Sequence, residues 1–390
     1  MTRRVIASLF FIALVLASAA AWRLLHRTAP GPLQFSHVHF SDLPDWNAGD
    51  PRQALRAFQR SCTVMAAAPP ETVVGAYAGS VADWRGVCDA AGKADINAAR
   101  DFFEQWFAPL AVSAGSTSDG LFTGYYEPQL HASIARHGRY QTPVYALPED
   151  LVTVDLGRFR DALKGEHVTG RVEDHSLVPY PTRADIDADG LRPAKVLFYA
   201  DDPVAVFFLH IQGSGRVTFD DGTTARVAYA GQNGRPYTAI GRTLIAQHQL
   251  TRDKTSLQTI RAWLLAHPDQ ARAVMESDAS FVFFKQAPVG DPALGAVGAE
   301  GVALTPEASI AVDAKIHPLG APFFIETSLP RGGKLNRLFV AQDTGGAIAG
   351  AVRADVFFGF GARAQALAGE MKQTGRMFVL LPKPVAARIR

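Results

Sequence analysis

The sequence of 390 residues is 48% hydrophobic and 19% charged, which is ordinary globular composition and long enough for two domains. Lysine and arginine number 39 and aspartate and glutamate 37, so the net charge of +2 is too small for this length to indicate a nucleic-acid binder, and we expect no nucleic-acid partner. Any electrostatic specialisation must therefore be local.

The N-terminal segment has the pattern of an export signal. Arg3 and Arg4 precede a nearly uncharged run, 5–22, and small residues around Ala19 offer cleavage sites. The run is about long enough to span a bilayer, so residues 1–30 are expected to be a cleaved signal peptide or an uncleaved anchor. We expect an exported protein, periplasmic or envelope-associated, that contacts a membrane only through this segment if it is retained.

The chain has two cysteines, Cys62 and Cys88. In an exported protein a single disulfide is the natural interpretation, and two buried thiols are the alternative. A loop of this size, once closed, would stabilise the fold by roughly 3 kcal/mol through restriction of the unfolded chain. Neither cysteine has a second cysteine or a histidine at metal-binding spacing, so we expect no metal, and no cofactor is required.

Several prolines and the lack of a sustained period predict a loop over residues 24–51. Apolar residues at helical spacing then predict three helices, one beginning at Asp50 and Pro51, one carrying Trp84 and Cys88, and one running from Asp95 to Pro109. From Leu121 onwards, short apolar runs separated by turn residues indicate a mainly β protein with flanking helices.

Further elements follow the same reasoning. Strands are expected at 196–199, 204–211, 217–219, 226–229, 281–284, 309–312, 323–326, 338–341 and 377–381, and helices at 238–247 and 256–266. Asp220-Asp221-Gly222 predicts a hairpin turn, because Asp-Gly supplies the positive φ that a tight turn requires.

Standard catalytic motifs are missing from the sequence: there is no zinc-protease helix motif, P-loop, nucleophile elbow or dinucleotide fingerprint. The segment Gln212-Gly213-Ser214-Gly215 suits a bend where backbone approaches a ligand. An ordinary turn or bulge explains it equally well.

The strongest group of candidate residues is three aspartates within 43 residues, Asp313, Asp343 and Asp355, each at the end of an apolar run. We expect them to end strands at a common edge of a sheet. Gly345 and Gly346 would leave room there for an extended ligand. The alternative is three surface acids that cap turns.

Asp343-Thr344-Gly345 also has the form of the aspartic-protease signature, in which two carboxylates share a proton. The triplet occurs once, so a protease would need a symmetric homodimer. An aspartic-type hydrolase therefore stays a minor alternative.

Several separated segments together resemble the membrane-bound lytic murein transglycosylase A family. They are LFTGYYEP (121–128), FLHIQGSGRV (208–217), YAGQNGRPYTAIGR (229–242), SFVFFK (280–285), SIAVDAKIHPLG (309–320) and AQDTGGAIAGAVRADVFFGFG (341–361). Their order as well as their content carries the resemblance, which extends from about the first helix to the end of the chain.

The resemblance implies a double-psi β-barrel domain formed by residues 31–127 and 286–390, and a second, inserted β-barrel domain over 128–285, with a glycan-binding groove between them. The family's catalytic aspartate falls on Asp355, and Asp343 and Asp313 carry over as supporting groups. The residues that match groove-facing segments are Thr123, Tyr125, Tyr126, Gln212, Gly213 and Ser214.

Two departures from the family pattern stand out. Typical members have lysine where this chain has Ala349, so a cation near the carboxylates is replaced by a methyl group. Many relatives are lipoproteins, but the signal region of this chain contains no cysteine to carry a lipid.

The activity that the resemblance implies is cleavage of the β-1,4 bond between N-acetylmuramic acid and N-acetylglucosamine in peptidoglycan, by a monomer. The 6-hydroxyl of the muramic acid attacks its own anomeric carbon, so one aspartate can act as acid and then as base. Asp355 would need a raised pKa, which burial and neighbouring acids provide. The alternatives are a hydrolase of the same glycan and a glycan-binding module without catalysis.

Overall fold

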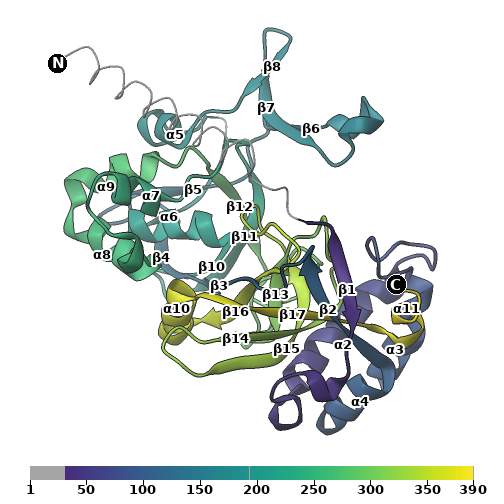
Figure 1. The fold of residues 1–390 in the computed structure, drawn as a ribbon. Helices are drawn as coiled ribbons and strands as arrows, with labels where there is room; N and C mark the ends of the chain where they lie inside the picture. The colour runs from purple at the N-terminus through teal and green to yellow at the C-terminus, as the bar shows by residue number, and fades with distance from the viewer. Residues whose placement is uncertain (1–30, 193, 390) are drawn as a thin grey trace, which may run out of the picture.

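The computed structural model describes residues 31–192 and 194–389. Two sheets make up most of the molecule and helices lie at their flanks (Figure 1), so the prediction of a mainly β fold with flanking helices is confirmed. Within the described residues, no helix combines the length and the hydropathy needed to cross a bilayer. The predicted signal or anchor at 1–30 lies outside the described residues.

Strands from both ends of the chain form the larger sheet, in the order β1-β2-β17-β14-β15-β13-β16-β3. β17 also pairs with β3, so six of the strands close into a ring with no free edge. The bounds are β1 (Leu33–His37), β2 (Phe107–Ala114), β3 (Gly120–Glu127), β13 (Ser309–Val312), β14 (Pro322–Ser328), β15 (Lys334–Asp343), β16 (Arg353–Phe360) and β17 (Lys372–Pro382). The double-psi crossovers of this barrel stay a prediction.

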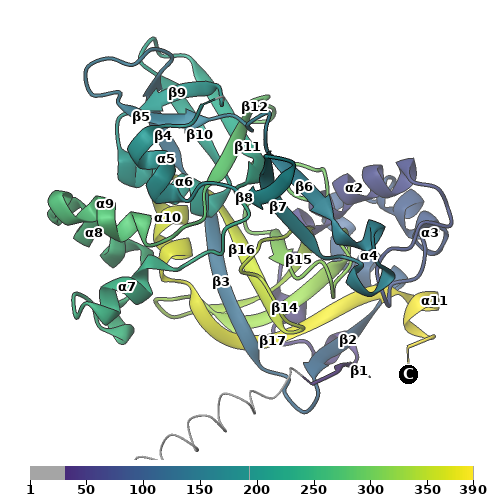
Figure 2. The same ribbon diagram turned by 90° about the horizontal axis from the view of Figure 1, so that it is seen from above.

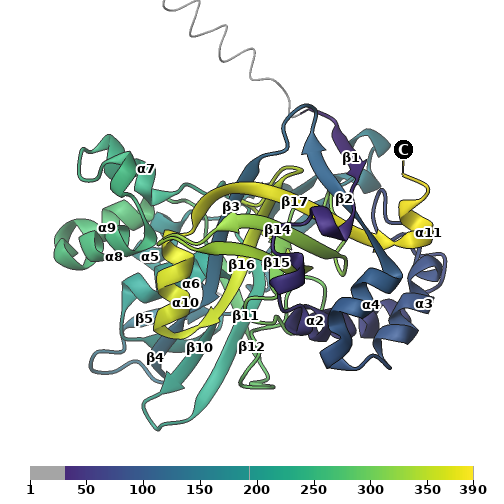
Figure 3. The ribbon, with the colours of Figure 1, turned by 60° about the horizontal axis from the view of Figure 1, so that its bottom comes forward.

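Three helices, α2 (Arg52–Ala67), α3 (Val81–Ala91) and α4 (Ala99–Trp106), pack together at one side of the barrel (Figure 3). Their apolar faces bury Phe58, Trp84 and Phe103 completely, as the helical spacing predicted. Cys62 of α2 and Cys88 of α3 form a disulfide, with 5.2 Å between their Cα atoms. The helices therefore make one covalently joined layer against the barrel.

Two boundaries differ from the prediction. The third helix stops at Trp106 because Phe107 already enters β2, and a short 3-10 turn, Ile96–Ala98, capped by Asp95, precedes it. The expected loop at 24–51 contains β1, which pairs antiparallel with β2, and two 3-10 turns, Phe40–Asp42 and Trp46–Ala48. A five-residue edge strand is too short to show a clear alternating pattern.

The second sheet has the order β12-β11-β10-β4-β9-β5. Its strands are β4 (Gln129–Ser133), β5 (Thr142–Tyr145), β9 (Val196–Ala200), β10 (Ser214–Phe219), β11 (Thr224–Gln232) and β12 (Val282–Ala287). A bridge between Ala146 and Phe284 brings the two edges of this sheet together. The predicted hairpin between β10 and β11 is confirmed, with Gly222 at a φ of 82°.

The predicted strand at 204–211 is wrong, because these residues form the helix α6 (Pro203–Gln212). Asp202 caps the helix by accepting hydrogen bonds from two backbone N–H groups, and Pro203 occupies its first turn. Gly213 ends it in the left-handed conformation. Most of the helix is buried, so its apolar residues show no helical period.

Helices α7 (Ile240–Ala246), α8 (Leu257–Ala266) and α9 (Pro268–Glu276) pack around α6. The predicted helices at 238–247 and 256–266 are thus confirmed with shorter ends, whereas α9 was not expected. Gln258 of α8 donates a hydrogen bond of 2.9 Å to the carbonyl of Gln365 in α10 (Gly361–Glu370), which connects this helical layer to the barrel. A last short helix, α11 (Lys383–Ala386), follows β17.

A small sheet of β6 (Val152–Asp155), β7 (His167–Glu173) and β8 (Ser176–Pro179) projects from the molecule near α5 (Arg183–Asp189). Seen from above, it overlies the central part of the molecule (Figure 2). Three 3-10 turns complete the chain, at Leu156–Arg158, Asp161–Leu163 and Arg252–Lys254.

The junction between the two large sheets is held by a buried ionic cluster. Glu127, the last residue of β3, is completely buried and pairs with Arg216 at 2.9 Å and with Arg226 at 3.1 Å. Arg216 also donates to the carbonyl of Leu294, at 2.9 Å, in the segment that returns from the second sheet to the barrel. Both chain crossings between the sheets therefore meet at one fixed point.

Candidate active site

The strand directions bring the three aspartates to one end of the barrel. β13 runs parallel to β15 and antiparallel to β16, so the ends of β13 and β15 lie beside the start of β16. Ala311 of β13 is paired with Asp343 on one side and with Asp355 on the other. Asp355 is thus near the beginning of its strand, and our expectation that it ends one is wrong. Its apolar run continues on the other side of the aspartate.

Asp355 is positioned by the neighbouring strand β3, which pairs with β16 in parallel and places Thr123 opposite it. The Thr123 hydroxyl donates a hydrogen bond of 2.6 Å to Asp355 Oδ1. Arg353 Nη2 in turn donates to the Thr123 hydroxyl oxygen at 2.8 Å. Because the arginine occupies the acceptor side of this hydroxyl, the threonine proton is directed at the carboxylate.

The carboxyl group of Asp355 is set up to exchange a proton near neutral pH. Burial raises its pKa to about 6, and the negative charge of Asp343 adds to this effect. The Thr123 hydrogen bond and the Arg353 charge act in the opposite direction. A substantial fraction of the molecules therefore carries a protonated Asp355 at mildly acidic pH.

Asp343 ends β15 and is held by three donors. Tyr125 Oη donates to its Oδ2 at 2.9 Å, and the backbone N–H groups of Ala299 and Thr344 donate to its Oδ1 at 3.0 Å. Burial raises the pKa of Asp343, and these hydrogen bonds oppose the rise. Burial also raises the pKa of Tyr125 well above its ordinary value, so the phenol keeps its proton and acts as a donor.

Asp313 has a structural role that differs from those of Asp343 and Asp355. Its carboxylate accepts from the backbone N–H of Gly350 at 2.9 Å and from that of Lys315 at 3.1 Å. Gly350 belongs to the loop between β15 and β16, residues 344–352, that leads into Asp355. Asp313 therefore holds this loop against the end of β13.

His317 holds the same loop and is itself held by Tyr77, and neither residue was a candidate in the sequence analysis. His317 Nε2 is 2.6 Å from the carbonyl of Ala351, and His317 Nδ1 is 2.6 Å from Tyr77 Oη. Burial lowers the pKa of His317 to about 4, so the ring is neutral, with Nε2–H as donor and Nδ1 as acceptor. The histidine follows Asp313 by four residues within a family-like segment, which was the only available signal.

Of the remaining predicted residues, those of β3 divide by strand face. Thr123 and Tyr125 share the face that carries the carboxylate contacts. The Tyr126 side chain lies on the other face of the strand, is only 5% exposed and packs in the main hydrophobic core, so its contact with substrate stays a prediction. Its backbone N–H donates to Gln212 Oε1 at 3.0 Å, which joins the end of α6 to β3.

The glycines leave open space, as expected from their lack of a side chain. A Cβ atom added to Gly213 or Gly346 would meet no atom within 4 Å, and one added to Gly345 would contact only Ile348. Ser214 begins β10 directly after Gly213 and is partly exposed. Ala349, which replaces the usual lysine, is exposed in the β15–β16 loop.

A fourth acid, Glu300, was missed because it lies in an irregular segment. Its carboxyl accepts from the Ser61 hydroxyl at 2.7 Å, and burial raises its pKa to about 7. Its backbone N–H donates to the carbonyl of Gln342, one residue before Asp343. Nowhere in residues 31–192 and 194–389 do three histidine, cysteine or acidic side chains form a group that could hold a metal ion.

A closed β-barrel with two buried carboxyl groups of raised pKa at one end has the arrangement that enzymes use for acid–base chemistry. Residues 121–285 match the family described as MltA specific insert domain, and residues 308–381 match the 3D domain. The membrane-bound lytic murein transglycosylase A of Escherichia coli K12 is 34% identical over 279 residues, which cover 69% of this chain and 67% of that protein. The chain belongs to the membrane-bound lytic murein transglycosylase A family.

Solved structures agree with this assignment. A membrane-bound lytic murein transglycosylase from Agrobacterium tumefaciens superimposes with a TM-score of 0.81 at 33% identity, covering 92% of this chain and 100% of that one. Escherichia coli MltA with bound chitohexaose gives a TM-score of 0.66 at 28% identity, covering 91% and 95%.

Proposed function

We propose that the chain cleaves the β-1,4 bond between N-acetylmuramic acid and N-acetylglucosamine in peptidoglycan and leaves a 1,6-anhydromuramic end. The observation that carries this proposal is the environment of Asp355, a buried carboxyl with a pKa raised to about 6, held by Thr123 at the edge of the barrel. The names of the relatives, lytic murein transglycosylases, support the same substrate and reaction.

In the first step, protonated Asp355 donates its proton to the bridging oxygen, and the bond from that oxygen to the anomeric carbon breaks. In the second step, the 6-hydroxyl oxygen of the same sugar bonds to the anomeric carbon, and the Asp355 carboxylate takes the hydroxyl proton. The residue is then protonated again and ready for another turnover. No water is consumed.

One acid suffices because the nucleophile is part of the substrate. Ordinary glycosidases need a second carboxylate to activate water or to attack carbon. An internal hydroxyl replaces that requirement, since well-oriented intramolecular attack can lower a barrier by roughly 7 kcal/mol or more. Asp343 is a poor candidate for a second base, because its oxygens already accept three hydrogen bonds.

We place the glycan along the face of β3 that carries Thr123 and Tyr125, between the β15–β16 loop and the α6–β10 junction. Gly345 and Gly346 border one side, and Gln212, Gly213 and Ser214 border the other. The Gln212–Tyr126 hydrogen bond supports this placement, because it fixes the α6 end against β3. Escherichia coli MltA binds chitohexaose, a neutral glycan, which supports a glycan-binding site in this chain.

We further propose that residues 31–127 with 286–390 and residues 128–285 form two domains, and that the chain works as a monomer at the cell envelope. The sheet order supports this division, because all strands up to β3 and from β13 onwards belong to the barrel sheet. The membrane-bound nature of the named relatives supports the envelope location.

The test is digestion of purified sacculi by the wild type and by Asp355→Asn, followed by mass spectrometry. We expect wild type to release anhydro-muropeptides and the variant to release almost none. Asp89→Asn, at an exposed position of α3, is the matched control and should behave as wild type. Products heavier by one water would indicate a hydrolase, sacculus binding without release would indicate a non-catalytic module, and normal release by Asp355→Asn would reject the catalytic assignment.

A further inference from the structure

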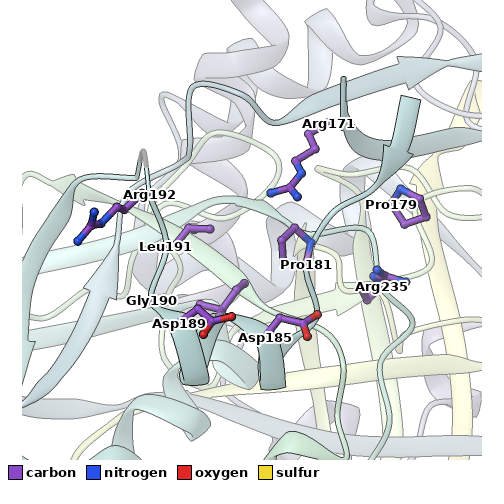
Figure 4. A pocket seen from close by; sticks show the side chains of 10 residues that line it. Arg171, Pro179, Pro181, Asp185, Asp189, Gly190, Leu191, Arg192 and Arg235 are labelled. Carbon is purple, nitrogen blue, oxygen red and sulfur yellow. The ribbon is translucent and has the colours of Figure 1, made fainter. Parts of the chain in front are cut away.

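A hollow of about 430 Å³ lies beneath the β7–β8 hairpin, where the small projecting sheet meets α5 (Figure 4). Three arginines and two aspartates are among the residues that line it: Arg171, Arg192, Arg235, Asp185 and Asp189. None of these residues belongs to the carboxylate site of the barrel. Where the lactyl carboxyl of each muramic acid is amide-linked to a peptide stem, the sugar chain itself is uncharged, so its recognition does not explain a hollow with this lining.

Arg235 is held in place by a rigid turn after β11. The turn is fixed by Asn233, a fully buried residue that donates to the carbonyls of Pro181 at 2.8 Å and Ala279 at 2.9 Å. Arg235 Nε donates to the carbonyl of Tyr180 at 2.7 Å. Within the described residues, its two terminal nitrogens have no hydrogen-bond partner, so the outer edge of the guanidinium is available to a ligand.

Arg171 faces the same hollow from β7. Its guanidinium lies 5.9 Å from the centre of the Tyr180 ring and pairs with Glu173. In the part of the chain that the structure describes, its buried Nε has no hydrogen-bond partner. Figure 4 shows Arg171 extending from the hairpin toward α5, while Arg192 lies apart on the far side. Arg171 and Arg235 are therefore the two arginines best placed to bind one ligand.

The two aspartates make the hollow suited to a ligand that carries both positive and negative charges. Asp185 is partly occupied, because it caps α5 by accepting from Thr182. Asp189 is exposed at the end of the helix. A ligand with only negative charge, such as phosphate, would be repelled by Asp189, whereas a peptide with carboxylates and an ammonium group would match both signs.

The register of β11 connects the hollow to the proposed glycan path. Ser214 is paired with Ala228, and β11 continues from there to Gln232, four residues or about 13 Å further on, just before the Asn233 turn. A peptide stem of four or five residues spans at most roughly 13 to 18 Å when extended. A stem attached to a sugar near Ser214 could therefore bring its charged end into the hollow.

We propose that this hollow binds the charged end of the peptide stem carried by the muramic acid, with Arg171 and Arg235 holding its carboxylates and Asp189 facing its amino group. The inference rests on the proposed function, because peptidoglycan is the glycan that carries such stems. Arginine binds carboxylates through paired, charge-assisted hydrogen bonds, which fits the outer edge of the Arg235 guanidinium. Arg171, which also pairs with Glu173, adds a second positive charge beside it.

The test uses the full chain and a synthetic stem tetrapeptide that has free carboxylates and a diamino acid at its third position, with binding measured by calorimetry. Arg171→Gln and Arg235→Gln are expected to weaken binding at least about tenfold, since each removes charge-assisted hydrogen bonds. Arg160→Gln, an exposed arginine near the same small sheet, is the matched control. Thermal unfolding of each variant is recorded as a check on folding.

A second arm needs no variant. The same peptide with its carboxylates amidated should bind wild type at least about tenfold more weakly than the charged peptide. Equal affinity for the two peptides, equal affinity of the Arg171 variant and wild type, or no binding of the charged peptide would overturn the inference. Cleavage of sacculi, which carry the stems, by wild type is measured in parallel. Cleavage without peptide binding would leave the proposed function standing, and peptide binding without any cleavage would reject the function instead.

Discussion

Replacing Thr123 with valine keeps the size of the side chain and removes the hydroxyl that donates to Asp355 at 2.6 Å. A hydrogen bond to a charged group contributes about 1.5 to 3 kcal/mol, and one pH unit corresponds to 1.36 kcal/mol, so the pKa of Asp355 should rise by roughly one to two pH units. The pKa rises rather than falls because the lost hydrogen bond stabilised the charged form of Asp355. Arg353 Nη2 also loses its acceptor, but Nη1 keeps the carbonyls of Leu121 and Ala354, so the arginine charge stays nearby.

The pH profile of kcat/KM on peptidoglycan measures this change. Activity requires protonated Asp355 in the first step, so the rate should fall as pH rises through its pKa, and in Thr123→Val this fall should occur at higher pH than in wild type. Thr344→Val is the control, because the Thr344 hydroxyl donates to the Val312 carbonyl and does not touch Asp355. An alkaline limb at the same pH in Thr123→Val and wild type would refute the reasoning.

Three further predictions concern stability and loop position. The pKa of Glu300 is raised from 4.5 to about 7, so its protonated carboxyl stabilises the fold below pH 4.5 and this contribution is lost as the pH rises through about 7. Glu300→Gln should remove roughly 3 kcal/mol of the pH dependence of the unfolding free energy, measured by urea titration. An unchanged pH dependence would contradict this prediction. Asp313→Ala removes the acceptor of the Gly350 N–H and should lower the unfolding free energy by about 1 to 3 kcal/mol. It should also lower kcat more than it changes KM, and an unaltered kcat would contradict a role of Asp313 in positioning the β15–β16 loop. Glu127→Gln leaves the buried Arg226 and the partly buried Arg216 without their anion and should lower the unfolding free energy by roughly 3 to 5 kcal/mol. A loss below about 1 kcal/mol would be inconsistent with a buried ion cluster.

The sequence predicted the elements whose side chains alternate or repeat clearly. The helix of Leu55, Phe58 and Cys62 has one apolar face against a solvated one, and the Asp220-Asp221-Gly222 turn has a backbone requirement that few residues meet. The strand predicted at 204–211 failed because a helix buried on most sides has no polar face, so its pattern matches a buried strand equally well.

The site was predicted from residue types and resemblance, but the different contacts of the three aspartates depend on strand register. Asp343 and Asp355 face each other across β13 because one partner strand is parallel and the other antiparallel, which no local pattern records. Arg353 and His317 lie in segments that resemble the family, but their roles could not be predicted, since their contacts join residues from distant parts of the chain. The roles of Asp355, Asp343 and Asp313 stay proposals that mutation must test.

In the proposed mechanism, Asp355 donates a proton and then takes one back, while the 6-hydroxyl of the substrate attacks its own anomeric carbon and no water takes part. Digestion of sacculi in water labelled with heavy oxygen tests this most directly, with mass spectrometry of the new glycan ends. We expect wild type to release anhydro ends that carry no label and Asp355→Asn to release almost nothing. Heavy oxygen at the new ends, or unlabelled anhydro products released at the normal rate by Asp355→Asn, would contradict it.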